Sequence, residues 1–187
     1  MSLIWVREES PVWDGDKQRI IGGAPVGAFV LPFTQGDALP GEWWSARDCP
    51  EGEGEAESEI VGYGRLDVSW GGDAEVLLAV DPGCQERGVG SFVLAKLEEE
   101  AVVRGINYVY NTVRDHEARD LVHDWLVVRG FRGPVDGDLR KRVGGSKAEP
   151  ARRAPVATPY DVRADPGGRA PGHEEQGGYV GVDEHQY

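Results

Sequence analysis

The sequence is poor in cysteine, which limits the kinds of fold and site that it can encode. Its 187 residues include only Cys49 and Cys84, which lie far apart and match no metal-ligand spacing. Small secreted domains that depend on disulfides carry many more cysteines. We therefore expect two reduced thiols, no disulfide framework and no metal site.

Long apolar runs are also absent. No segment approaches the roughly 20 consecutive apolar residues that a helix needs to cross a bilayer. The first seven residues lack the basic start and apolar run of a secretory signal peptide. We therefore expect a cytoplasmic protein without a membrane partner. The 40% of hydrophobic residues, six tryptophans among them, are enough to build the core of one domain.

Basic residues are outnumbered by acidic ones. The chain has 20 lysines and arginines against 33 aspartates and glutamates, and its net charge is −13. A surface of this sign repels phosphate backbones, so we expect no nucleic-acid partner. The same charge suits a cationic, amine-bearing substrate, and it equally suits the plain role of keeping the protein soluble.

Hydrophobic periodicity predicts an α/β domain with a mixed, mostly antiparallel central sheet flanked by helices. Strands are expected at residues 3–6, 42–47, 59–70, 74–80, 106–113 and 139–143. Helices are expected at residues 12–21, 90–104 and 117–128, where apolar residues recur at helical spacing. The segment 74–80 is almost continuously apolar, which predicts a strand that is buried on both faces.

The composition changes after Val143. Residues 144–187 are rich in Pro, Gly, Ala and Arg and contain few large apolar side chains. We therefore predict one domain at residues 1–143 and a C-terminal extension at residues 144–187. The extension is either a flexible solubilising tail or a segment that joins a homodimer or a larger assembly. The acidic, glycine-rich run at residues 51–59 predicts a solvated hairpin loop.

The segment from Gln85 to Ser91 has the features of a phosphate-binding loop. It lies between the predicted buried strand and an amphipathic helix, whose first turn exposes unpaired amides and a partial positive charge. Gly88 and Gly90 remove the Cβ atoms that would block a phosphate, and Arg87 can add a charge-assisted contact. Glycines at helix ends are common without any ligand, so the flanking strand and helix are what favour phosphate binding.

A family resemblance follows from these residues. Gln85-Glu86-Arg87-Gly88-Val89-Gly90 matches the Q/R-x-x-G-x-G/A signature of the GNAT superfamily of N-acetyltransferases. Leu78–Pro82 and Leu94–Glu98 on either side resemble that family's strand and helix, and Gly130-Phe131 resembles its Gly-Phe pair. The resemblance implies a GNAT-like fold, acetyl-coenzyme A as co-substrate, and acetyl transfer to a primary amine of a small molecule or a protein.

The same resemblance implies roles for two segments. In this family the backbone of the strand pairs with the pantetheine arm, which here involves Leu78, Ala79 and Val80. The loop amides hold the pyrophosphate, and the loop residues are Gln85, Glu86, Arg87, Gly88, Val89, Gly90 and Ser91. The family also opens a V-shaped gap between this strand and the next, here residues 106–113, through which the thioester reaches the amine.

The sequence does not decide which residues transfer the protons of the reaction. The amine must lose a proton and the departing thiolate must gain one. Many family members place a Tyr in the helix before Gly-Phe, but residues 121–128 contain none. Glu75 is a candidate base, and His116 and His123 are titratable replacements for the Tyr. Each of the three also has a plain interpretation as a surface or packing residue.

Two further questions stay open from the sequence. Trp43, Trp44, Tyr63 and Trp70 either line an acceptor pocket or pack in the core. The missing Tyr and the long extension also allow an alternative function. In that alternative the chain is a GNAT-fold acyl-coenzyme-A-binding module with weak or no catalysis, which joins a larger assembly through residues 144–187.

Overall fold

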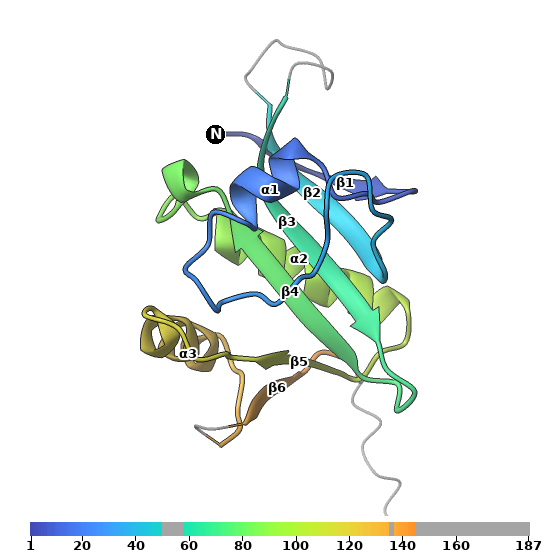
Figure 1. Cartoon of the computed structure of the whole chain (residues 1–187). Helices are drawn as coiled ribbons and strands as arrows, with labels where there is room; N and C mark the ends of the chain where they lie inside the picture. The colour runs from blue at the N-terminus through green and yellow to red at the C-terminus, as the bar shows by residue number, and fades with distance from the viewer. Residues whose placement is uncertain (50–57, 135–136, 145–187) are drawn as a thin grey trace, which may run out of the picture. The chain divides into compact units, whose positions relative to one another are not determined.

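The structure, a computed structural model, describes residues 1–49, 58–134 and 137–144. The described chain forms β1 (Leu3–Glu8), α1 (Gly15–Ile20), β2 (Glu42–Asp48), β3 (Glu59–Val68), β4 (Ala74–Val80), the 3-10 turn η2 (Pro82–Cys84), α2 (Val89–Val103), β5 (Tyr108–Thr112), α3 (Arg119–Val128) and β6 (Asp138–Arg142). The strands make one sheet in the order β1-β2-β3-β4-β5-β6 (Figure 1). Only β4 and β5 pair in parallel, so the predicted mixed, mostly antiparallel sheet is confirmed.

Helices cover the two faces of this sheet. Figure 1 shows α1 in front of the strands and α2 behind them. Helix α1 begins three residues later than the sequence predicts, because the Asp14 carboxylate accepts from the Lys17 amide and caps the helix there. Helix α2 ends at Val103, and Gly105 follows with a φ of +73°, which lets the chain leave the helix toward β5.

Strand β4 is buried on both faces, as its apolar run predicts. Ala74 and Val76 belong to the core beneath α2, whereas Leu77 and Ala79 belong to a second core beneath α1. Successive side chains of a strand point to opposite faces, so the two cores meet across β4. The strand is therefore held firmly at the centre of the sheet.

Three of the four aromatic residues that the sequence left open are core residues. Trp43, Trp44 and Tyr63 are at most 1% exposed, and Trp44 stacks on Trp5 with ring centroids 5.9 Å apart. Trp70 lies in the turn between β3 and β4 and is fully exposed. The packing interpretation therefore holds for the first three.

Some sequence predictions fall outside the described residues. These are the loop expected at residues 51–59, of which the structure describes only 58 and 59, and the extension from residue 145 onward. The described chain ends with Val143 and Gly144, whose amides donate to the Asn107 carbonyl. Within the described residues, no helix has the length and apolar character needed to cross a membrane.

An ion pair joins the first residue of β2 to the end of α2. The Arg104 Nε and Nη2 atoms donate to the two carboxylate oxygens of Glu42 at 2.8 and 2.6 Å. This hydrogen bonding holds the pKa of Glu42 below its ordinary value. A carboxyl whose pKa is lower in the folded than in the unfolded chain stabilises the fold above its unfolded pKa. That contribution is lost as the pH falls through the folded value.

We expect Glu42→Gln to lower the free energy of unfolding by about 1 kcal/mol at pH 7. The difference in free energy of unfolding between the variant and the unaltered protein should shrink as the pH falls below about 4, where Glu42 is protonated in the unfolded chain. Urea unfolding at several pH values measures it. Glu99→Gln is the control, because Glu99 pairs with Lys96 on the surface and is 64% exposed. An equal, pH-independent loss in both variants would contradict the prediction.

Candidate functional site

The site begins where β4 and β5 stop pairing. The two strands pair only at Ala74 with Val109 and at Glu75 with Tyr110. One residue further, the Asn111 side-chain amide donates to the Val76 carbonyl at 2.9 Å in place of a backbone partner. Beyond this contact β4 has no strand partner on its β5 side among the described residues. The strands thus leave a V-shaped gap, as the resemblance implies.

The backbone of β4 presents free polar groups to this gap. The N–H and C=O of one strand residue point to the same edge, and successive residues alternate between edges. Because the Val76 carbonyl faces β5, the backbone groups of Leu78 and Val80 face the gap. Those of Ala79 face β3, where Ala79 is in register with Tyr63. Of the three strand residues assigned from the resemblance, two therefore offer their backbone to a ligand.

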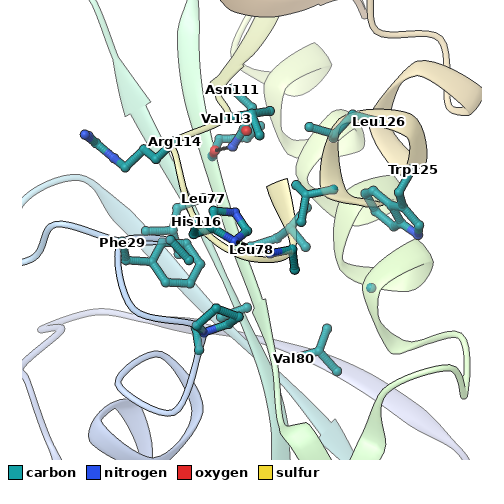
Figure 2. Close-up of a pocket in the computed structure, with 18 of the residues that line it drawn as sticks. Phe29, Leu77, Leu78, Val80, Asn111, Val113, Arg114, His116, Trp125 and Leu126 are labelled. Atoms are coloured by element: carbon teal, nitrogen blue, oxygen red, sulfur yellow. Dashed lines mark hydrogen bonds between the residues drawn. The ribbon is translucent and has the colours of Figure 1, made fainter. Parts of the chain in front are cut away.

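A cavity of about 930 Å³ occupies the gap. Both faces of β4 line it: Glu75, Leu77 and Ala79 from the α1 side, and Val76, Leu78 and Val80 from the α2 side. Figure 2 shows Trp125 of α3 on one side of β4 and Phe29 on the other. The cavity therefore passes through the sheet instead of lying on one face of it.

The first turn of α2 closes one end of the cavity. Gly88 is the N-cap residue, with a φ of +88° that favours glycine, and no side chain caps the free amides of the turn. A Cβ atom on Gly90 would lie 3.4 Å from the Trp125 ring and 3.5 Å from Val80. The turn therefore presents unpaired N–H donors beside a narrow passage, which suits an anion.

Not every residue of the predicted loop faces the cavity. Gln85, Glu86, Gly88, Gly90 and Ser91 line it. Val89 instead points into the core and is 1% exposed, and Arg87 is exposed away from the cavity. The part of the loop that lines the cavity thus includes two glycines and Ser91, and Arg87 lies outside this lining.

Arg129 supplies a cation at this end of the cavity, which no short sequence pattern indicates. Arg129 follows α3, and its Nη2 donates to the Ser91 hydroxyl at 2.8 Å, while its Nη1 donates to the Trp125 carbonyl at 3.0 Å. Its guanidinium also lies 3.7 Å from the centroid of the Trp125 ring. Burial lowers the pKa of Arg129 from its ordinary value, yet a guanidinium keeps its charge in proteins. Arg129 therefore adds a fixed positive charge to the amides of the first turn of α2.

Glu75 lies at the closed end of the gap and lines the cavity. Its Oε2 atom accepts from Arg65 Nη2 at 3.3 Å, and the same guanidinium is 3.5 Å from Asp67. Burial, and then the charge of Glu75, raises the pKa of Tyr110 on the neighbouring strand. Glu75 is therefore an oriented carboxylate at the end of the cavity, beside a neutral phenol.

The two candidate histidines lie in different places. His116 lines the cavity, and its Nδ1 accepts from the Ala118 amide at 3.2 Å (Figure 2). This contact places the proton of the neutral ring on Nε2. His123 is on α3 but does not line the cavity, and it contacts Asp124 at 3.2 Å. No group of three or more metal-binding side chains gathers anywhere in the described residues.

The remaining wall comes from the long loop between α1 and β2. Phe29, Leu31 and Phe33 line the cavity and pack against the core beneath α1. Gly27 holds this loop close to the opposite wall, since a Cβ atom on it would lie 2.8 Å from the Asp115 carbonyl. Its φ of +92° also favours glycine. No short sequence pattern marks this loop as part of a site, because its role depends on contacts with distant residues.

The acetyltransferase (GNAT) family model matches residues 27–123, which is more than half of the chain. No curated protein sequence matches the chain significantly. The matched region contains β2 to β5, the loop before α2 and the wall from Phe29 to Phe33.

Solved structures match as well. The solution structure of YhhK from Escherichia coli, bound to coenzyme A, has a TM-score of 0.52 and 18% identity over 76% of this chain and 99% of that one. The ribosomal-protein alanine N-acetyltransferase from E. coli has a TM-score of 0.49 and 15% identity over 79% and 98% of the two chains. PaiA N-acetyltransferase from Thermoplasma acidophilum, in complex with coenzyme A, has a TM-score of 0.42 and 18% identity over 54% and 59%. The YhhK match supports the fold, and at this identity it supports the fold alone.

Proposed function

The chain belongs to the acetyltransferase (GNAT) family, and on that premise we propose that it transfers the acetyl group of acetyl-coenzyme A to a primary amine. The observation that carries the proposal is the gap between β4 and β5, which opens beside the uncapped first turn of α2. Free strand backbone and free helix amides are the two features that a pantetheine arm and a pyrophosphate require.

The cofactor-binding residues follow from this geometry. Leu78 and Val80 offer the backbone groups that pair with the amides of the pantetheine arm. Gly88, Gly90 and Ser91 surround the amides that hold the pyrophosphate, and nothing lies within 4 Å of the Cβ position of Gly88. Arg129 supplies a guanidinium for the phosphate oxygens, an interaction that is stronger than one between neutral groups.

The chemistry is a direct acyl transfer. The amine nitrogen attacks the thioester carbonyl carbon, the carbon–sulfur bond breaks, and the proton that the attacking nitrogen then loses is taken up by the thiolate of coenzyme A. Before the attack the ammonium form of the acceptor must lose a proton, and we assign this step to the Glu75 carboxylate. We assign to the His116 Nε2–H a hydrogen bond to the oxygen that becomes negative during the attack. Both residues line the cavity.

A coenzyme-A-binding module without turnover is the second candidate. It is favoured by one observation: no tyrosine is among the described residues that line the cavity. The thiolate then lacks the proton donor that many family members use. Binding of acetyl-coenzyme A without thiol release over a panel of amines would support this candidate over the enzyme.

The first test concerns the cofactor. Acetyl-coenzyme A at 100 times its dissociation constant should stabilise the protein by about 2.7 kcal/mol, seen as a rise in Tm. Replacement of Gly88 and Gly90 by valine should abolish this rise, because side chains then occupy the phosphate position. Gly105→Val is the matched control, since Gly105 also has a positive φ but lies at the other end of α2. An unchanged rise in the double variant would place the cofactor elsewhere.

The second test concerns proton transfer and charge stabilisation. Glu75→Gln should lower kcat by on the order of 10²–10⁴, and His116→Gln by on the order of 10²–10³. Both variants should keep the Tm rise with acetyl-coenzyme A. His123→Gln is the comparison, because His123 does not line the cavity. Thiol release from acetyl-coenzyme A with a free amine as acceptor measures all three variants. Full activity of Glu75→Gln, under conditions where the chemical step limits turnover, would remove Glu75 from the mechanism.

A further inference from the structure

The α1 side of the cavity has the features of an acceptor site, and its composition limits what the acceptor is. Phe29, Leu31 and Phe33 form an apolar wall there, continuous with Leu77 and Ala79 of β4. Phe33 is held in place by Trp13, whose ring centroid is 6.1 Å away. The three wall residues are only partly buried, so they keep apolar surface for a ligand. Burial of a ring-sized group against this surface is favourable.

The charged groups on this side are not all paired with one another. Arg65 is paired with Glu75 and lies near Asp67, which gives this group no excess of positive charge. Arg114 also lines the cavity, is exposed, and makes no ion pair with the described residues. Its neighbour Asp115 does not line the cavity. Arg114 is therefore a cation of the α1 side without a carboxylate partner among the described residues, which suits a carboxylate on the ligand.

Three recognition elements thus surround the space in front of β4. Glu75 lies at the closed end of the gap, the apolar wall comes from the α1–β2 loop, and Arg114 comes from the segment after β5. Figure 2 shows Arg114 and Phe29 on the same side of β4. A base for an amine, a surface for an apolar group and a cation for an acid are the three contacts that an amino acid requires.

Resting on the proposed function, we propose that the acceptor is an amine carrying both an apolar, ring-sized side group and a carboxylate, as in an apolar amino acid. The amine lies toward Glu75, the side group lies against Phe29 and Phe33, and the carboxylate pairs with Arg114. This acceptor is zwitterionic, whereas the net charge of the chain by itself points to a cationic one.

Four amines that differ in two features test the proposal. L-Phenylalanine has the ring and the carboxylate, phenethylamine lacks the carboxylate, L-alanine lacks the ring, and ethylamine lacks both. We expect kcat/KM for thiol release to be highest for phenylalanine, and to fall about tenfold or more when either feature is removed. Faster release with ethylamine or with a polyamine such as spermidine than with phenylalanine would overturn the acceptor class and leave acetyl transfer intact.

Variants connect each feature to its residue. Phe29→Ala should reduce the preference for phenylalanine over alanine, and Arg114→Gln the preference for phenylalanine over phenethylamine, each about tenfold. The controls are Trp70→Ala, an exposed aromatic outside the cavity, and Arg142→Gln, an exposed arginine on β6. The Tm of each variant and its rise with acetyl-coenzyme A show that the fold is kept. Unchanged preferences in both folded variants would overturn the assignment.

Binding separates this proposal from the proposed function. Calorimetry on protein saturated with coenzyme A should show tighter binding of phenylalanine than of alanine or phenethylamine, whether or not turnover occurs. Equal or weaker binding of phenylalanine overturns the acceptor class. Absence of thiol release with every amine, together with the expected binding order, overturns acetyl transfer and supports the acceptor site.

Discussion

The candidate site depends on how early β4 and β5 stop pairing. Two residue pairs join them, and the Asn111 side chain then takes the Val76 carbonyl that the next pair would have used. Further pairing would have closed the sheet and removed both the cavity and the free backbone of Leu78 and Val80. Because buried backbone polar groups need partners, an open strand edge in the middle of a sheet is suited to a ligand that behaves like a strand.

The wall on the α1 side of the cavity is supported by an unusual core. Lys17 of α1 is 1% exposed, and its ammonium lies 2.9 Å from Glu8, 3.2 Å from Asp14 and 4.6 Å from the centroid of the Tyr63 ring. A buried charge is tolerated only when it is paired, so this cluster fixes α1 against β1 and β3 in one arrangement. The core beneath α1, on which Phe29 and Phe33 pack, is thereby held in one position against β4.

Short sequence patterns predicted those parts of the site whose residues follow one another in the chain. The apolar run of β4, the helical period of α2 and the glycines between them predicted a strand, a helix and an anion-binding turn, and the first two are confirmed. Arg129 was missed because its partner Ser91 lies 38 residues earlier. The wall from Phe29 to Phe33 was missed because irregular chain has no period. Whether His116 and His123 face the cavity depends on the packing of two elements, the segment after β5 and helix α3. No short sequence pattern predicts that packing.

The passage of the cavity through the sheet has a kinetic consequence. A site on one face of a sheet makes two ligands share one entrance, so that the first to bind controls access for the second. Here the α2 side offers the helix amides and Arg129, and the α1 side offers Glu75 and the apolar wall. Two ligands that approach from opposite faces meet only at β4, and neither blocks the other's route. On the proposed function, this arrangement predicts a ternary complex that forms without a compulsory order of addition, with each product leaving by the face at which its substrate arrived.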